Sequence, residues 1–279
     1  MGVPEGDAFM SEDFTYTVLG STGIRVHRLG LSATYRPGKR TIHRAIDEGV
    51  NFFFGFGVDT QLTSVLRDVF KSNRDRYVLA TGAYNLLLGY PNLRRTLEKR
   101  LRQVRTDYID AFLFLGVTSP KHFPDRAREE LYRFREEGKV RSIGMSCHDR
   151  KFIGRLAAEG ALDVFMLRYN AAHRGAERDI FPNLNNHNPG VVAYTATRWT
   201  YLMRRPKGWP TDGRIPTAGM CYRFVLSHPN VHVCVTAPTN QKQLEENIAA
   251  LHEGPLNEED TQFMKKFGDT VYLSRKWFM

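Results

Sequence analysis

Apolar runs rich in β-branched and aromatic residues alternate with amphipathic stretches along this chain, at a spacing of about thirty residues. The amphipathic stretches place apolar residues four positions apart, as in Leu93, Leu97 and Leu101, while arginine and glutamate fill the other faces. This spacing predicts helices that pack one face against a sheet. The runs that predict strands are 28–31, 51–54, 77–81, 108–115, 142–146, 164–169, 191–194 and 232–235.

Eight strands that alternate with helices predict an α/β fold, a closed parallel (β/α)8 TIM barrel. The strands are almost continuously apolar, as expected when both faces of a sheet are buried. The segment 16–25, with Gly20-Ser21-Thr22-Gly23 between apolar arms, predicts an N-terminal β-hairpin on the barrel floor. No linker divides the chain, so residues 1–279 are expected to form one domain. A doubly wound open sheet is the alternative, but the chain lacks the Gly-rich phosphate turn that usually follows its first strand.

Glycine and polar residues predict where elements end. Gly49 and Gly138 follow helical stretches, where a left-handed residue commonly closes a helix. The stretches 183–190 and 204–216 are rich in Asn, Pro and Gly and predict loops.

Composition excludes several classes of protein. The 279 residues are 42% hydrophobic and 25% charged, which is typical of a globular protein and not of a disordered one. No apolar run is long enough to cross a bilayer, and residues 1–13 lack an apolar signal core. The three cysteines Cys147, Cys221 and Cys234 share no metal-type spacing and cannot all pair in disulfides, which favours a reducing cytoplasm. The net charge is +10, but the basic residues are spread along the chain and interleaved with acidic ones, so nucleic-acid binding is not expected. A basic surface or a phosphorylated ligand explains the positive charge.

Six strings of this chain, in order and at matching spacing, resemble the aldo-keto reductase family. They are Leu19-Gly20-Ser21-Thr22-Gly23 followed by Arg28-Leu29-Gly30-Leu31, the run 45–53 (AIDEGVNFF), Thr106-Asp107-Tyr108-Ile109-Asp110, the run 137–146 (EGKVRSIGMS), Tyr169-Asn170 and Gln243-Leu244-Glu245-Glu246-Asn247. The resemblance covers about nine tenths of the chain and implies the same barrel. It also implies hydride transfer from NADPH to a carbonyl, assisted by a tyrosine acid, a lysine paired with an aspartate, and a histidine.

The four positions that match this tetrad carry other residues. The aspartate corresponds to Phe54, the tyrosine to Asp59, the lysine to Gly82 and the histidine to Leu115. An alkoxide that forms in a dry pocket needs an acid and a neighbouring cation, so ordinary carbonyl reduction is not expected. Asp59 and His148 are the candidate catalytic residues that remain. Tyr35 and Tyr84 are alternative phenols near the mouth, and a solvated loop aspartate or helix cap is the alternative interpretation of Asp59.

The implied cofactor is NADP(H), and part of its site is kept. At the nicotinamide end Cys147 and Met166 replace the family's amide side chains, and Ala237 stands where a phosphate-binding lysine is common. Lys242 or Arg198 is the candidate cation for a 2′-phosphate. The resemblance implies that Ser146 and Tyr194 contact the nicotinamide and that Thr195 meets the pyrophosphate. At the adenosine end the candidate cofactor-binding residues are Thr239, Asn240, Gln243, Glu246 and Asn247, of which the last two match residues that contact adenine.

Two further groups of residues suggest chemistry. Cys147 and His148 are adjacent, but neighbours on a strand point to opposite faces, which argues against a thiolate pair. His173 and Arg174, together with Arg36, Arg168 and Arg198, could form a cationic rim for an acidic ligand. No metal site is predicted.

The sequence therefore predicts an aldo-keto reductase homologue that binds NADP(H) and has non-standard or lost catalysis. The alternative is a pseudoenzyme barrel that binds a ligand or a protein. A small-molecule ligand at the barrel mouth is the expected partner, a protein partner is left open, and no membrane partner is expected.

Overall fold

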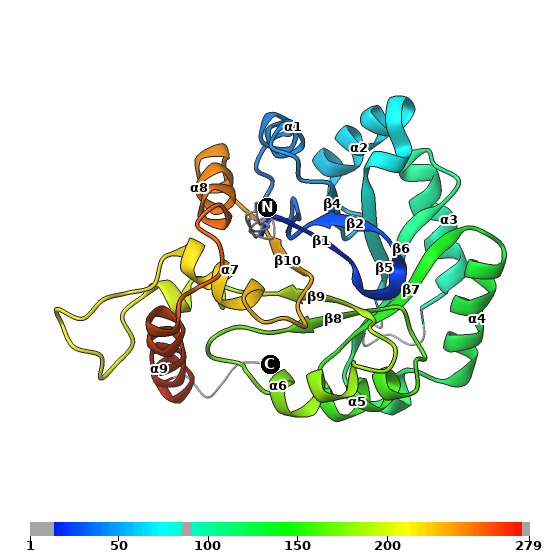
Figure 1. Ribbon diagram of the computed structural model, residues 1–279. Coiled ribbons are helices and arrows are strands. Elements are labelled where there is room, and N and C mark those ends of the chain that lie inside the picture. Colours follow the sequence, from blue (N-terminus) through cyan, green and yellow to red (C-terminus); the bar gives the residue numbers. More distant parts are fainter. Residues whose placement is uncertain (1–13, 85–90, 275–279) are drawn as a thin grey trace, which may run out of the picture.

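The computed structural model describes residues 14–84 and 91–274. Within them, eight parallel strands close into a barrel in the order β10-β3-β4-β5-β6-β7-β8-β9, with helices around the outside (Figure 1). The barrel strands are β3 (Leu29–Leu31), β4 (Phe52–Gly55), β5 (Val78–Tyr84), β6 (Ile109–Val117), β7 (Val140–Cys147), β8 (Val164–Arg168), β9 (Gly190–Tyr194) and β10 (Val233–Thr236). Each overlaps one of the eight predicted strands, so the predicted (β/α)8 fold is confirmed.

The helices carry their apolar stripes toward the strands. They are α1 (Lys39–Asp47), α2 (Thr60–Asn73), α3 (Leu93–Val104), α4 (Asp125–Glu136), α5 (Arg150–Ala158), α6 (Ala176–Asp179), α7 (Ala218–Leu226), α8 (Gln241–Leu251) and α9 (Glu258–Ser274). In α3 the predicted stripe of Leu93, Leu97, Leu101 and Val104 is buried. Gly49 and Gly138 follow α1 and α4 with φ of +88° and +71°, as predicted.

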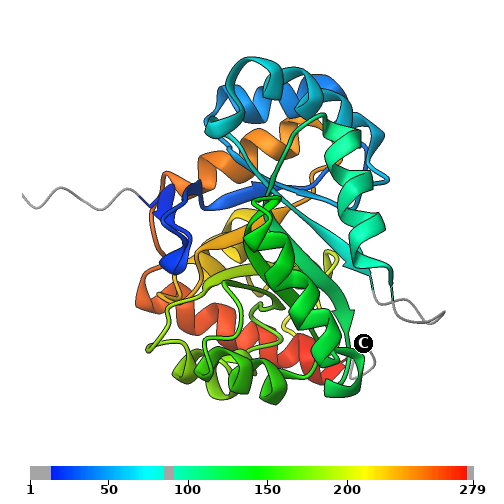
Figure 2. The same cartoon turned by 90° about the vertical axis from the view of Figure 1, so that its right-hand side faces the viewer.

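The predicted hairpin closes the barrel floor. Strands β1 (Tyr16–Val18) and β2 (Arg25–His27) pair antiparallel, and Figure 2 shows this hairpin (dark blue) at one end of the barrel. The Ser21 N–H donates to the Asn188 carbonyl at 2.7 Å, and the buried side chain of Leu19 packs beside Gly190 at the start of β9. The other end, where the strands finish, is therefore the mouth.

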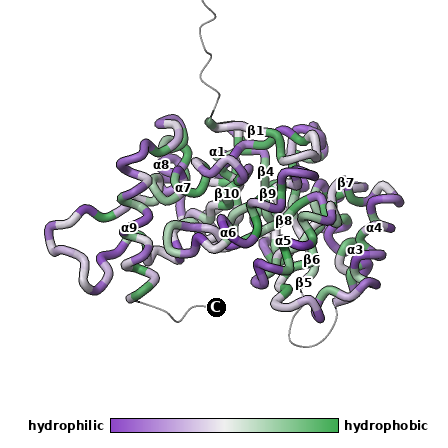
Figure 3. Tube along the Cα trace, turned by 60° about the horizontal axis from the view of Figure 1, so that its bottom comes forward, coloured by the Kyte–Doolittle hydropathy of each residue, from purple (hydrophilic) through white to green (hydrophobic). Residues whose placement is uncertain are grey.

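Apolar side chains form one layer between strands and helices and a second one inside the barrel. The interior layer holds Phe52, Phe54, Val78, Ala80, Ala111, Leu113, Leu115, Val164, Met166, Val192 and Val233, with Leu19 and Val26 from the hairpin segment below. The stretch 204–216 projects beyond α9 as a largely hydrophilic loop, as predicted (Figure 3). Among the described residues, no helix is long and apolar enough to cross a bilayer.

A histidine at the start of β10 makes the stability of the barrel depend on pH. His232 Nδ1 accepts a hydrogen bond from the Val191 N–H at 3.0 Å, so its ring must be unprotonated at Nδ1. Burial, with a smaller effect of Arg28, lowers the pKa of His232 to about 4. Because the pKa of His232 is lower in the folded protein, the unfolded chain binds more protons at mildly acidic pH. The contribution of neutral His232 to stability is therefore lost progressively as the pH falls below about 6.5.

We expect His232 alone to lower the free energy of unfolding by about 2 kcal/mol between pH 7 and pH 5. Urea unfolding at both pH values measures this loss. His232→Asn keeps an acceptor for the Val191 N–H but does not titrate, so this variant should show a correspondingly smaller loss. An equal pH dependence in the two proteins would assign the effect to other groups.

Candidate functional site

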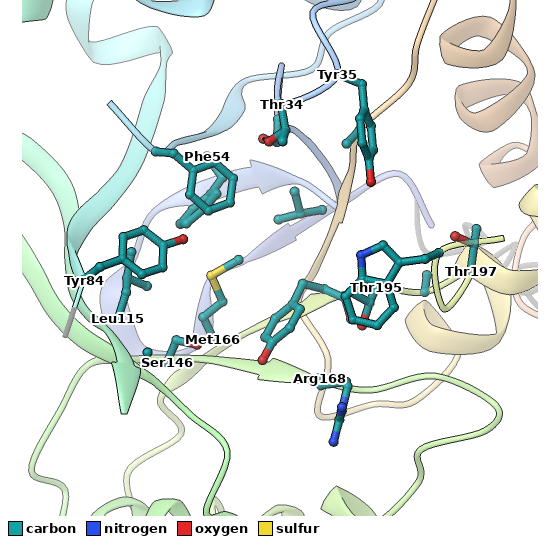
Figure 4. A pocket seen from close by; sticks show the side chains of 18 of the residues that line it. Thr34, Tyr35, Phe54, Tyr84, Leu115, Ser146, Met166, Arg168, Thr195 and Thr197 are labelled. Atoms are coloured by element: carbon teal, nitrogen blue, oxygen red, sulfur yellow. The ribbon is translucent and has the colours of Figure 1, made fainter. Parts of the chain in front are cut away.

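A cavity of about 510 Å³ occupies the mouth of the barrel. Aromatic and hydroxyl side chains dominate its lining (Figure 4). Of the described residues that line it, none carries a carboxylate, and those with basic side chains are His148 and Arg168. The cavity therefore suits a flat, largely apolar molecule with a few hydrogen-bonding groups.

One wall of this mouth cavity is apolar. Phe54 and Leu115 are buried at the ends of β4 and β6, and Figure 4 shows both facing the cavity beside Met166. The Phe54 ring meets the Phe56 ring edge-on at 4.8 Å, and Phe56 stacks on Tyr84 at 5.7 Å with an interplanar angle of 17°. Three rings thus form one aromatic cluster at the side of the cavity.

Gly82 has no room for a side chain. A Cβ built on Gly82 would lie 1.9 Å from the carbonyl oxygen of Leu113 on the neighbouring strand β6. The strand also does not end at Gly82, as the sequence alignment assumed, but continues to Tyr84. Tyr84 consequently lines the mouth cavity, and its hydroxyl points into it (Figure 4).

Asp59, a predicted catalytic residue, does not line the mouth cavity. It lines a second cavity of about 640 Å³ on the other side of Phe56 and Tyr84. Its Oδ2 accepts from the Phe56 N–H at 2.9 Å and makes no capping bond to α2. Burial raises the pKa of the Asp59 carboxyl, against the Phe56 hydrogen bond and the charge of Arg100.

His148, the other predicted catalytic residue, does line the mouth cavity. Partial burial and the charge of Arg168 lower the pKa of His148, so its ring is neutral near pH 7. The adjacent Cys147 is buried in the layer between strands and helices, and burial raises the pKa of its thiol to about 11. The two residues therefore form no thiolate–imidazole pair, in agreement with the alternation of side chains along a strand.

Three predicted cofactor residues come together at the cavity, namely Ser146, Tyr194 and Thr195. The Tyr194 side chain on β9 hydrogen-bonds Ser146 on β7, two strands away. Thr195 has a left-handed φ of +60°, and its carbonyl accepts from the Asn170 side-chain amide at 2.8 Å. Asn170, fully buried, thereby ties the loop after β8 to the loop after β9.

Several residues that line the mouth cavity were missed by the sequence analysis. Ser32 and Thr34 directly follow the first barrel strand, and their hydroxyls are 2.8 Å apart. That position was a usable signal, because mouth residues of such barrels follow strand ends. Tyr222 lies on α7, and its hydroxyl reaches Thr236 at 2.8 Å. No local pattern indicates that a helical tyrosine reaches the mouth.

Comparison with known proteins identifies the family. The model of the aldo/keto reductase family matches residues 32–205, which is more than half of the chain. The chain belongs to the aldo/keto reductase family. It is 28% identical over 214 residues to the uncharacterized oxidoreductase YrpG of Bacillus subtilis, covering 64% of this chain and 65% of that one. It is 22% identical over 219 residues to the NADH-specific methylglyoxal reductase of Escherichia coli, covering 66% of each.

The coverage of these matches is partial. The chain spans slightly less than two thirds of YrpG and 61% of the aldo-keto reductase YhdN of Bacillus subtilis. Among solved structures, the holo form of the aldo-keto reductase AKR11C1 from Bacillus halodurans superposes with a TM-score of 0.74 at 20% identity, covering 91% of this chain and 96% of that one. This likeness shows the fold. Members of the family generally bind NAD(P)H.

The predicted adenosine-end residues lie around the start of α8 and away from the mouth cavity. Asn240 caps α8 by accepting from the Gln243 N–H at 3.0 Å, and the Gln243 side chain accepts from the Thr239 N–H at 2.9 Å. Glu246 is exposed. Asn247 is buried and donates to the Thr236 hydroxyl at 3.1 Å. The side chains of Asn240, Gln243 and Asn247 thus already hold this end of the barrel together.

The cations suggested for a phosphate or an acidic ligand do not gather at the mouth. Arg198 was predicted to be available to a ligand, and this is wrong: its side chain is 1% exposed and donates to the Val271 carbonyl in α9 at 2.9 Å. Lys242 is exposed and lies 3.9 Å from Glu246. Arg174 bonds the Lys265 carbonyl and Asp269.

The remaining members of the predicted rim are separated as well. The Arg168 guanidinium points away from the mouth cavity (Figure 4), on the side where it shares a small cavity with His173. Burial, reinforced by nearby arginines, lowers the pKa of His173 to about 4. Arg36 lines the second cavity, beyond Phe56. The predicted cationic rim is therefore not formed as one cluster.

Proposed function

We propose that this protein binds a small aromatic or conjugated molecule in the mouth cavity and does not reduce carbonyls by the usual route of its family. One observation carries the proposal: the positions that match the catalytic tetrad supply an apolar wall. Phe54 and Leu115 contribute side chains to that wall, Gly82 has no room for one, and Asp59 lies in the second cavity.

The proton donor is the critical requirement of carbonyl reduction. The family lowers the pKa of a tyrosine with a lysine, so that the phenol can protonate an alkoxide. Here burial raises the pKa of Tyr84, and the charge of Asp59 raises it further. Burial also raises the pKa of Tyr194. Neither phenol therefore has the lowered pKa that favours proton donation in the family.

A second candidate function is an NADP(H)-dependent oxidoreductase. The contact between Tyr194 and Ser146 favours it, because the resemblance assigns both residues to the nicotinamide. The other residues do not fit that cofactor. Met166 offers the carboxamide no strong hydrogen bond, Ala237 offers the phosphates no charge, and Arg198 is engaged with Val271. We therefore derive no hydride-transfer step.

We expect the purified protein to reduce methylglyoxal with NADH or NADPH at least about 1,000-fold more slowly, in kcat/KM, than a reductase of the family assayed beside it. Losing even one preorganised polar group typically costs two to three orders of magnitude in rate. Steady-state absorbance at 340 nm measures the turnover. Turnover at the rate of the reference reductase would contradict the proposal.

Calorimetric titration decides between the two candidates. NADPH, NADP⁺ and 2′-phospho-ADP-ribose are titrated separately into the protein. The ligand-binding proposal expects none of them to bind at micromolar concentrations. Micromolar binding of all three would support the oxidoreductase, whereas binding of 2′-phospho-ADP-ribose with no gain from nicotinamide would indicate a nucleotide site with another use.

A further inference from the structure

The mouth cavity and the second cavity adjoin each other; together they are called the cleft, and the second cavity is its outer compartment. They share Thr34, Phe56 and Tyr84 in their linings. The outer compartment is walled by the loops that follow β3 and β4, and it contains Asp59 and Arg36. The outer compartment therefore lies directly beside the mouth cavity, next to the two stacked rings.

Asp59 is the single carboxylate in the cleft among the described lining residues. It is held in place because its Oδ2 accepts from the Phe56 N–H at 2.9 Å, and no ion pair within the described part of the chain neutralises it. The charge of Arg100 acts on Asp59, but its guanidinium donates to the Phe56 carbonyl at 2.9 Å and to Gln103 at 3.0 Å. The hydrogen bonds of Arg100 therefore leave the Asp59 carboxylate open to a ligand.

The rings beside Asp59 favour the same kind of ligand. Phe56 and Tyr84 stack at 5.7 Å, and Phe54 meets Phe56 edge-on. The faces of aromatic rings attract cations, and a partly desolvated carboxylate gains most from a cation that can also donate hydrogen bonds. The raised pKa of Asp59 agrees with this desolvation.

We propose that the cleft recognises an aromatic amine, with the ring of the ligand in the mouth cavity and its ammonium group on the carboxylate of Asp59. This inference rests on the proposed function, because it names the class of the ligand that the mouth cavity binds. Arg36 lines the outer compartment as well, so an aromatic carboxylate is the competing class.

Three indole compounds of similar shape test the proposal, namely tryptamine, tryptophol and indole-3-propionate. They carry an ammonium, a hydroxyl and a carboxylate, respectively, at the end of the same kind of chain. We expect calorimetry at pH 7 to show tryptamine binding at least about tenfold more tightly than tryptophol, with indole-3-propionate weakest. In Asp59→Asn this preference should fall about tenfold or more, while the affinity for tryptophol stays the same.

The matched control is Asp68→Asn. Asp68 lies on α2, is exposed, and pairs with Lys71 at 3.1 Å outside the cleft. Its replacement should leave the preference unchanged. The amide oxygen introduced by Asp59→Asn can still accept from the Phe56 N–H, and an unchanged melting temperature would confirm that the fold is kept.

Other results separate the two proposals. Equal affinities for tryptamine and tryptophol, tighter binding of indole-3-propionate, or an undiminished preference in Asp59→Asn would overturn the amine assignment. Binding of tryptophol would then still support the ligand-binding function. Failure of all three indoles to bind would overturn both.

Discussion

Gly82→Ala is expected to lower the free energy of unfolding by at least about 3 kcal/mol, because overpacking against backbone cannot be relieved by a rotamer change. The added Cβ would lie 1.9 Å from the Leu113 carbonyl oxygen, and β5 and β6 pair directly at these two residues. The strands would have to separate at the point where the barrel interior meets the mouth. Urea unfolding monitored by circular dichroism measures the loss.

Gly55→Ala is the matched control for this prediction. Gly55 ends β4, and a Cβ there would meet Leu79 and Leu62 at ordinary distances of 3.6 and 3.8 Å. We expect its effect to stay within about 1 kcal/mol. If both alanines had the same effect, the close approach at Gly82 would not constrain the barrel. The same contact bears on function. Gly82 corresponds to the lysine of the family's tetrad, and a lysine at this position would meet the Leu113 carbonyl oxygen as well.

Asp110→Ala is expected to destabilise the protein by about 3–5 kcal/mol, because it removes the acceptor of a buried N–H and the carboxylate partner of a partly buried guanidinium. Asp110 is 1% exposed, and its Oδ2 accepts from Arg74 at 2.6 Å and from the Leu79 N–H at 2.9 Å. These bonds join β5 and β6 to the turn after α2 near the floor. Burial raises the pKa of Asp110, while Arg74 favours its charged form.

Two further substitutions show whether the pairing itself is responsible. Asp110→Asn keeps an acceptor and should be intermediate between Asp110→Ala and the unaltered protein. Asp68→Ala removes an exposed partner of Lys71 and should change the free energy of unfolding by less than about 1 kcal/mol. Equal losses in Asp110→Ala and Asp68→Ala would show that burial adds nothing to the ion pair.

The fold was predictable because its signals are local. Each barrel strand is a short apolar run, and the helices between them repeat apolar residues at the helical period, as Leu93 and Leu97 do in α3. Gly49 and Gly138 adopt the left-handed conformation that their positions after helices predicted. The ends of strands were less predictable: β5 runs on to Tyr84, because pairing with β6 and not the residue type decides where it stops.

The candidate site was predictable only in part. Alternation at the end of β7 correctly separated His148, which lines the mouth cavity, from Cys147, which does not. Residue type gave no indication that Arg198 would be buried against the carbonyl of Val271, 73 residues further along the chain. Asn247 was expected to contact adenine, yet its amide bonds Thr236 between α8 and the barrel strand β10.

The sequence by itself thus determined the barrel, the hairpin and the chemical types available at each strand end, since these follow from the periodicity and identity of neighbouring residues. The tertiary structure decided where the side chains at the strand ends lie and which cavity they face. It placed Asp59 in the outer compartment, Tyr84 in the mouth, and Gly82 against the Leu113 carbonyl. The physical reason is that side-chain direction and available space depend on contacts between strands and loops far apart in the chain, which no local pattern contains.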